Sequence, residues 1–272
     1  MMRVSRRQLL QALGASGAAA GIGFAAYTSG VGRGRAVVTR TLVPVAGLPR
    51  ALEGLRIGLL SDTHCGRFLP ASEVAAAATI LRDQSPDLVL LAGDYVSFAD
   101  RSMVAPCADA LAVARARFGV FAVTGNHDPE PTVIAEFERR GIQVLRDQCT
   151  SILARGERIS LGGLRYWSNK TADVGQLFRN ANGFPVLLSH DPRRFRQAAQ
   201  TGVPLVLSGH THGGQVVVPW LGAPAAARFP VVSGLARRDK TTLYVSRGLG
   251  TVYLPIRLNC PPEIAVLTLT RA

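Results

Sequence analysis

The sequence predicts an α/β fold with two facing sheets flanked by helices, and two observations carry this prediction. From residue 55 onward, short runs rich in Ile, Val and Leu alternate with segments of helical period. Such alternation is typical of βαβ units and a mostly parallel sheet with right-handed crossovers. Beyond about residue 150 the pattern changes to many strands and few helices, which predicts a second sheet.

The first half supplies alternating strands and helices in order. Each expected strand ends in a polar or glycine-containing turn; the strands are residues 55–60, 88–92 and 120–124. The expected helices are residues 71–84, 103–117 and 131–140.

The second half is predicted to be mainly strands. These are residues 150–154, 158–166, 186–189, 205–208, 215–218, 242–246 and 263–270. Two helices are expected, at residues 173–180 and 192–200. The longest irregular segment is residues 219–232, and long loops of this kind are often functional.

Composition limits the class of protein. The chain has 272 residues, of which 47% are hydrophobic and 6% aromatic, so it can bury a large core and is not mainly disordered, collagen-like or coiled-coil. The 31 basic and 18 acidic residues give a net charge of +13. That charge allows nucleic acid, an anionic membrane surface or a phosphate-bearing substrate as partner. The sequence shows no basic groove interleaved with aromatic residues, so nucleic acid is the least favoured of the three.

Residues 1–35 are expected to be a targeting segment. They contain five arginines and no acid, and the pair Arg6-Arg7 precedes an apolar, Ala- and Gly-rich run that ends near Tyr27. This arrangement resembles a twin-arginine (Tat) export signal. An uncleaved membrane anchor is the alternative, because the run approaches the ~20 residues needed to span a bilayer. The signal interpretation predicts contact with the Tat export machinery. Either interpretation predicts a periplasmic or other extracytoplasmic location and leaves residues 36–272 as one domain with a net charge of +8.

The four cysteines show no C-x-x-C spacing, which disfavours a zinc ribbon or a thioredoxin-type centre. They are expected to be buried thiols rather than disulfides. The four are Cys65, Cys107, Cys149 and Cys260.

All five histidines follow apolar, strand-like runs, and each has Asp, Asn or Gly within two residues. Ligands collect at the carboxyl ends of strands in α/β sheets. The spacings Asp62-x-His64 and His210-x-His212 place two side chains on one face of extended backbone. The candidate ligands are Asp62, His64, Asp94, Asn126, His190, His210 and His212. Seven nitrogen and oxygen ligands exceed the needs of one tetrahedral zinc but suit two ions sharing a bridging carboxylate.

Five motifs occur in order: Asp62-x-His64, Gly93-Asp94, Gly125-Asn126-His127-Asp128, His190 and Gly209-His210-x-His212. Together they resemble the motif set of calcineurin-like metallophosphoesterases. The segments 244–250 and 261–264 are similar to the YaeI/YkuE-type branch of exported bacterial phosphodiesterases. The resemblance implies a four-layer αββα sandwich.

The resemblance also implies a role for each site residue. Asp62, His64 and His212 would bind one ion, and Asn126, His190 and His210 the other. Asp94 would bridge the two. His127, with Asp128 behind it to orient the ring, would protonate or stabilise the leaving oxygen.

The predicted activity is hydrolysis of a phosphodiester by a hydroxide that bridges two divalent ions (Mn, Zn or Fe). An envelope or lipid phosphodiester is the favoured substrate. A pyrophosphatase acting on a UDP-diacylglucosamine-type lipid precursor, a phosphomonoesterase and a non-catalytic metal-binding envelope protein are the alternatives.

Two arginines, Arg67 and Arg247, are candidates for contacting the substrate phosphate, because a guanidinium can fork onto phosphate oxygens. The mostly apolar residues 216–232 are either a buried connection or an apolar lip that meets lipid.

Overall fold

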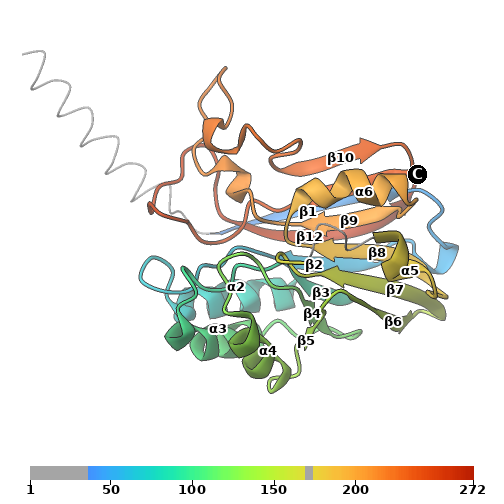
Figure 1. The fold of residues 1–272 in the computed structure, drawn as a ribbon, viewed down its shortest axis with the longest axis horizontal. Coiled ribbons are helices and arrows are strands. Elements are labelled where there is room, and N and C mark those ends of the chain that lie inside the picture. The colour runs from blue at the N-terminus through green and yellow to red at the C-terminus, as the bar shows by residue number, and fades with distance from the viewer. Residues whose placement is uncertain (1–35, 169–173) are drawn as a thin grey trace, which may run out of the picture.

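Two mixed six-stranded sheets face each other in the computed structural model, which describes residues 36–168 and 174–272 (Figure 1). The export segment expected at residues 1–35 lies outside the described residues. The predicted two-sheet α/β architecture is confirmed.

The first sheet is built around four parallel strands, β2 to β5, next to which β12 runs antiparallel to β2 and parallel to β1. In spatial order its strands are β1 (Val37–Val45), β12 (Glu263–Arg271), β2 (Arg56–Leu60), β3 (Leu88–Leu91), β4 (Val120–Ala122) and β5 (Gln143–Val144). The beginning and end of the described chain therefore pair with each other.

The second sheet has four central parallel strands, with one antiparallel strand at each edge. In spatial order its strands are β10 (Gly234–Arg238), β11 (Thr241–Val245), β9 (Leu205–Ser208), β8 (Phe184–Ser189), β7 (Glu157–Leu164) and β6 (Gln148–Ala154).

Helices cover the outer face of each sheet. The first sheet is covered by α2 (Ala71–Asp83), α3 (Val104–Leu111) and α4 (Glu130–Glu138). The second is covered by α5 (Val174–Phe178) and α6 (Phe195–Gln200). Short 3-10 turns complete the described part: η1 (Arg50–Leu52), η2 (Arg101–Met103), η3 (Pro192–Arg194), η4 (His212–Gly214) and η5 (Pro224–Ala226). The layers are thus helix, sheet, sheet and helix, as the resemblance implied.

Periodicity explains how α2 packs. Its buried residues are Val74, Ala77, Ala78 and Leu81, which follow the i, i+3, i+4, i+7 spacing of one helix face. The small alanines allow close approach to the sheet, and at Gly58 a Cβ would lie 2.9 Å from Leu81 Cδ1.

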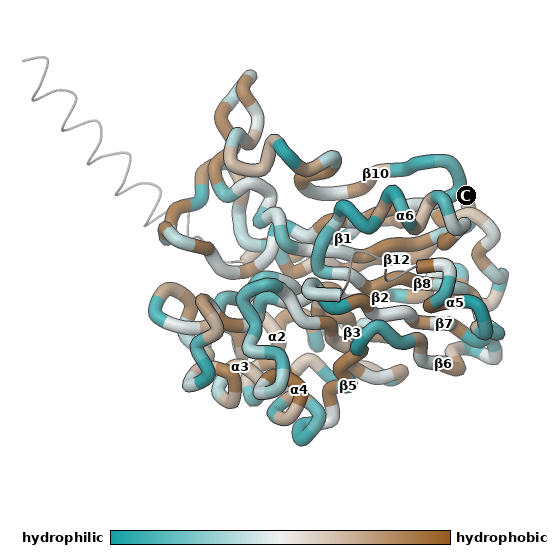
Figure 2. Tube along the Cα trace, in the orientation of Figure 1, coloured by the Kyte–Doolittle hydropathy of each residue, from teal (hydrophilic) through white to brown (hydrophobic). Residues whose placement is uncertain are grey.

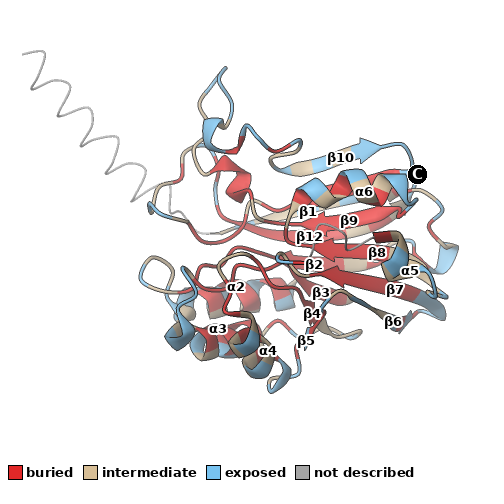
Figure 3. Ribbon diagram, in the orientation of Figure 1, coloured by how far each residue is buried: buried red, intermediate tan, exposed pale blue. Residues whose placement is uncertain are grey.

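The main core lies between the sheets, where the buried strands form the centre of the molecule (Figure 3). Leu59 and Leu90 of the first sheet belong to the same buried cluster as Leu161, Leu188 and Leu207 of the second. Burial on both faces explains why these parallel strands are continuous apolar runs in the sequence.

The predicted elements differ from those of the structure in several places. The segment 215–218 is not a strand, because Val217 N–H donates to the carbonyl of Leu258 in an irregular loop instead of joining the sheet. The strands β1, β5 and β10 were not predicted: β1 precedes the region of clear alternation, β5 has two residues, and β10 carries Arg237 and Arg238 on an exposed edge.

The four cysteines are free, as expected, and three of them are buried, with Cys149 half-buried. Among residues 36–168 and 174–272, no helix is both long and apolar enough to span a membrane.

Candidate metal centre

The predicted ligands lie where the carboxyl ends of strands from both sheets meet. Asp62 and His64 follow β2, Asp94 follows β3, and Asn126 follows β4. The second sheet contributes residues that follow β8 and β9, namely His190, His210 and His212. The chain thus brings the seven side chains from two separate sheets to one edge.

Six of these side chains form two donor groups. In each group, one ligand atom per residue can be chosen so that all three atoms lie within 4.8 Å of one another. The first group is Asp62, His64 and His212, and the second is Asp94, His190 and His210. Each group combines residues of both sheets.

One oxygen of Asp94 faces both groups. Asp94 Oδ2 lies 3.2 Å from His190 Nε2 in its own group and 3.7 Å from His64 Nε2 in the other. His64 Nε2 in turn lies 3.1 Å from His212 Nε2. A carboxylate oxygen between two sets of imidazoles is the arrangement that a bridging ligand requires.

Unpartnered buried atoms test whether these residues suit cations. Asn126 Oδ1, His210 Nε2 and His212 Nδ1 are buried and have no hydrogen-bond partner among the described residues. Buried polar atoms normally have a partner, and an unmatched one calls for an explanation such as an ion. Oxygen and imidazole donors suit Mn, Fe or Zn, so the residues fit a pair of divalent metal ions.

Backbone strain is concentrated in the same residues. Asp62, His64, Asp94, His210 and His212 all have positive φ, between 43° and 74°. This left-handed conformation costs a non-glycine residue about 1–3 kcal/mol and persists where surrounding structure enforces it, often at functional sites. At these strand ends it turns the chain sharply so that the side chains converge.

Two glycines permit the close approach of the ligand loops. A Cβ at Gly209 would lie 1.7 Å from Ser61 Oγ and 2.5 Å from Asp62 Oδ2. A Cβ at Gly125 would lie 2.1 Å from Asp94 Oδ1. Any side chain at either position would therefore displace a ligand carboxylate.

Hydrogen bonds fix the donor rings. His190 Nδ1 lies 2.6 Å from the carbonyl oxygen of Ala92, so Nδ1 carries the proton and Nε2 faces Asp94. Ser97 Oγ lies 3.3 Å from His64 Nδ1. Partners of this kind hold a metal-binding imidazole in one tautomer and orientation. Ser97 lies outside the recognised motifs, so the sequence alone did not mark it as a site residue.

Burial sets the protonation of the imidazoles. It lowers the pKa of His64 to about 4, lowers that of His210 to about 3, and holds that of His212 well below the ordinary value. Burial opposes the protonation of His190 as well, but the carboxylate of Asp94 and other partners raise its pKa to about 10. Three of the four rings are therefore neutral at pH 7, the form that coordinates cations.

His127 lies beside the two groups, where its ring centroid is 4.9 Å from that of His64. Its Nδ1 accepts a hydrogen bond from the backbone N–H of Phe98 at 3.2 Å, which places the proton of the neutral ring on Nε2. His127 N–H donates to Asp94 Oδ1 at 2.8 Å. The ring is thus held next to the bridging position with a proton available.

Asp128 does not orient His127 as expected. Its buried carboxylate accepts from the backbone N–H groups of Asp94, Gly125 and Tyr95 at 2.9, 2.8 and 2.7 Å. The reason is the turn geometry, which points the carboxylate toward these amides, while His127 uses the Phe98 amide. Asp128 therefore holds together the two loops that carry Asp94 and Asn126.

A cavity of about 330 Å³ opens onto the centre. Asp94, Asn126, His127, His210 and His212 line its floor, and its walls are formed by residues including Arg228, Phe229, Val252, Tyr253 and Leu254. Arg228 is exposed, with its guanidinium 5.1 Å from the ring centroid of Phe229. The sequence offered one signal for Arg228, its place as the single charge in the irregular segment after the last motif.

The two arginines predicted to contact substrate do not line this cavity. Arg67 is exposed, with its guanidinium 5.9 Å from the ring centroid of Phe68. Arg247 forms an ion pair with Glu263 at 3.2 Å and donates to Thr39 Oγ1 at 3.0 Å. Arg247 is therefore committed to joining the chain's last loop to β1 and β12.

A third arginine, Arg257, was not anticipated. It is 1% exposed, and its guanidinium donates to the backbone carbonyls of Arg247, Gly248, Gly250 and Cys260 at 2.5–3.2 Å. The loop that Arg257 holds also contacts the turn that carries Asp62. Leu249 N–H and Gly250 N–H donate to the carbonyls of Ser61 and Asp62.

The sequence and fold are similar to those of known proteins. Residues 55–219 match the family model of the calcineurin-like phosphoesterase superfamily domain. The chain is 30% identical to the uncharacterized metallophosphoesterase YkuE of Bacillus subtilis, with 99% of each chain covered. It is 35% identical to the phosphodiesterase YaeI of Escherichia coli, with 79% of this chain and 82% of YaeI covered.

Among solved structures, the 5′-nucleotidase precursor of Thermus thermophilus shares the fold, with a TM-score of 0.51 and 15% identity over 79% of this chain and 54% of that one. The ordered motifs, the four layers and the two donor groups agree with the family match. The chain belongs to the calcineurin-like phosphoesterase superfamily.

Proposed function

We propose that this protein is a binuclear metal-dependent phosphodiesterase that acts outside the cytoplasm on a lipid or other envelope phosphodiester. The observation that carries the proposal is the position of Asp94 Oδ2 between His190 and His64, at the junction of the two donor groups. When bound there, two divalent cations would neutralise phosphoryl oxygens and activate the attacking water. The name of YaeI, a phosphodiesterase, supports a diester substrate.

The chain's own residues would perform the remaining steps. His127, with its Nε2 proton free to donate, would protonate the departing oxygen. Arg228 on the cavity wall would contact a phosphate oxygen or a second anionic group of the substrate. The apolar side chains of Phe229, Tyr253 and Leu254 would exclude water from the bound ester.

Replacement of Asp94 tests this proposal directly. Asp94→Ala removes the oxygen shared by the two groups, so we expect fewer than two bound ions per chain and loss of metal-dependent hydrolysis of bis(p-nitrophenyl) phosphate. Asp109→Ala is the matched control, because Asp109 is exposed on α3 and paired with Arg140. Wild-type diester turnover by metal-loaded Asp94→Ala would refute the assignment.

The substrate class needs a separate experiment. Purified protein loaded with Mn, Fe or Zn would be offered phosphomonoesters, phosphodiesters and phospholipids, with its metal content measured in parallel. We expect diesters to turn over faster than monoesters. Fast monoester turnover with negligible diester turnover would replace the diester proposal with a phosphomonoesterase.

Export by the Tat route is supported by Arg6-Arg7 ahead of the apolar run. The test is replacement of both arginines by lysine in the full chain, expressed in a Tat-competent bacterium. We expect the variant to remain in the cytoplasm, whereas unchanged export would contradict the Tat interpretation.

A further inference from the structure

Exposed apolar side chains gather around the mouth of the metal-site cavity. Of the large hydrophobic residues exposed in the described part of the chain, five lie on loops that line the cavity or contact its lining: Phe98, Trp220, Leu221, Tyr253 and Leu254. We call these five residues the apolar rim. Their exposed fractions run from 61% for Leu254 to full exposure for Trp220. Scattered exposed hydrophobic residues are normal, but a cluster at a site entrance indicates an interaction surface.

Contacts connect the rim to the site. The ring centroids of Phe98 and Tyr253 are 5.7 Å apart, and each ring also contacts His127. Tyr253 and Leu254 line the cavity above the ligands. Anything that covers these side chains therefore covers the entrance through which substrate must pass.

The loops that carry the rim are braced. Gln215 Oε1 accepts from Val252 N–H at 2.7 Å, and Asn259 Nδ2 donates to Val217 O at 3.0 Å. The turn that presents Trp220 and Leu221 is closed by the hydrogen bond from Val218 N–H to Gly222 O at 2.7 Å. In Figures 1–3 the segment between β9 and β10 projects from the body and carries residues that are both apolar and exposed. These apolar side chains thus face solvent on loops that are held by hydrogen bonds.

Charge and chain placement favour an anionic bilayer as the occupant. The rim segments 215–232 and 248–259 contain no Asp or Glu, and their one exposed charge is Arg228, because Arg257 is buried. The segment that carries Phe98 contains the exposed pair Asp100 and Arg101, whose charges cancel, and residues 36–272 carry a net charge of +8. Trp and Tyr prefer the headgroup level of a membrane, where their rings are apolar and their polar atoms stay wet. A basic surface is drawn to anionic lipid.

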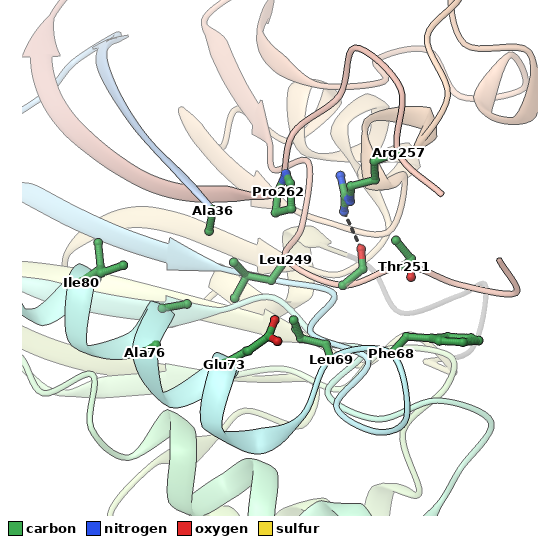
Figure 4. A pocket seen from close by; sticks show the side chains of 12 residues that line it. Ala36, Phe68, Leu69, Glu73, Ala76, Ile80, Leu249, Thr251, Arg257 and Pro262 are labelled. Atoms are coloured by element: carbon green, nitrogen blue, oxygen red, sulfur yellow. Dashed lines mark hydrogen bonds between the residues drawn. The ribbon is translucent and has the colours of Figure 1, made fainter. Parts of the chain in front are cut away.

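The described chain begins at a second cavity, which is lined in part by the loop that carries Tyr253 and Leu254. Ala36 lines this cavity of about 450 Å³ together with Phe68, Leu249 and Thr251, the last of which is two residues before Tyr253 (Figure 4). The 35 residues before Ala36 include the apolar run that ends near Tyr27. An anchor formed by that run would join the domain through Ala36, at the second cavity.

We propose that the apolar rim inserts into the interfacial layer of an anionic bilayer and presents a lipid phosphodiester to the metal centre. The choice of a lipid substrate rests on the proposed function. The insertion itself does not, because it can be measured without turnover. Insertion places the cavity mouth at the depth of the lipid phosphates, so the substrate need not leave the membrane.

The chain contains two tryptophans, Trp167 and Trp220, so Trp167→Phe leaves Trp220 as the single reporter in the full-length protein. On vesicles of phosphatidylcholine and phosphatidylglycerol we expect its emission to shift to shorter wavelength and to be quenched by brominated acyl chains. The control carries Trp167→Phe, Trp220→Phe and Leu153→Trp, because Leu153 is 61% exposed on β6, away from the rim. Its emission should not change, although the same N-terminal segment is present.

Three results would overturn insertion. One is unchanged Trp220 emission on vesicles that sediment with the protein, which would leave the N-terminal segment as the sole membrane contact. The second is equal quenching of Trp220 and the Leu153→Trp reporter. The third is a spectral shift that appears without lipid and grows with protein concentration, which would assign the rim to self-association.

A paired activity assay tests substrate presentation. The double variant Trp220→Ser and Leu221→Ser removes apolar area outside the cavity lining, so we expect at least about a tenfold loss of phospholipid hydrolysis on vesicles and unchanged hydrolysis of soluble bis(p-nitrophenyl) phosphate. Leu42→Ser with Leu153→Ser is the matched control. Vesicle turnover equal to wild type would refute presentation by the rim. Absence of soluble-diester turnover in the wild type would instead refute the proposed function, while the fluorescence result would still stand.

Discussion

His127 illustrates how a single residue can be assigned a role distinct from metal binding. It belongs to neither donor group, and its Nδ1 is occupied by the Phe98 amide. Replacement by Gln should therefore leave the ion content unchanged and remove the proton donor. We expect kcat to fall about 10²- to 10⁴-fold for a diester with an alkyl leaving group.

The leaving group supplies the control for this prediction. p-Nitrophenolate departs without protonation, so His127→Gln should affect its release much less. An equal loss for both leaving groups, or a loss of ions, would show that His127 supports the metal centre rather than proton transfer.

At the residue scale, the sequence predicted which side chains converge but not what each of them contacts. Asp62, His64 and His210 could be assigned to one site because each follows an apolar, strand-like run and belongs to an ordered set of motifs. The partners of Asp128 depend on the direction of its carboxylate within a turn, which spacing does not encode. The sequence marks Arg228 only as the single charge of an irregular segment, and its position on the cavity wall depends on how that segment folds.

At the scale of elements, the loop between β11 and β12 supports the ligand turn after β2. Arg257 holds this loop through several carbonyls, and no described acid pairs with its guanidinium. Burial lowers the pKa of Arg257, so the charged guanidinium relies on its hydrogen bonds to those carbonyls for stabilisation. Lysine retains a charge but lacks the planar fork that reaches several carbonyls.

Arg257→Lys is expected to lower the free energy of unfolding by about 2–4 kcal/mol, because buried carbonyls lose their donor. The ion held by Asp62, His64 and His212 should also be lost more readily. Denaturant unfolding and metal analysis measure the two effects, with Arg271→Lys at the exposed end of β12 as control. Stability and ion content equal to wild type would show that the loop does not depend on the hydrogen bonds of the Arg257 guanidinium.

Gly209 sets the distance between the loop after β9 and the turn after β2. In Gly209→Ala the added methyl group would collide with Ser61 and Asp62, so we expect weaker metal binding and at least about a tenfold loss of diester turnover. Gly202→Ala is the control, because nothing lies within 4 Å of its Cβ position and the strain of its positive φ costs about 1 kcal/mol. Equal metal affinity in the two variants would contradict this role.

Strands were predicted correctly where burial on both faces produces a continuous apolar run in the sequence. Strands β2, β3, β8 and β9 are buried on both faces, so they stand out as apolar runs. The edge strand β10 carries exposed arginines and lacks that signal. The segment 215–218 has the apolar pattern but pairs with a loop, which depends on tertiary contacts that local sequence does not reveal.

At the scale of the whole molecule, the sheets and the metal centre are interdependent. The core between the sheets is apolar, and its existence could be predicted from composition. That both sheets bring their ligand residues to the same edge could only be inferred from the order of the motifs. Each donor group takes residues from both sheets. A bound ion would therefore connect the sheets at the edge where polar residues replace the apolar core.

Metal removal should accordingly destabilise the fold as a whole. A ligand that binds only the folded chain adds about 2.7 kcal/mol at a hundredfold excess over its dissociation constant, so chelation of two ions should lower the thermal midpoint by several degrees. Hydrogen exchange should accelerate most at the ends of β2, β3, β8 and β9, and reloading with Mn, Fe or Zn should reverse both effects. If the apo and reloaded proteins unfold at one temperature, or if exchange rises in one sheet alone, the ions do not join the sheets, and the strained ligand turns must be held by the protein itself.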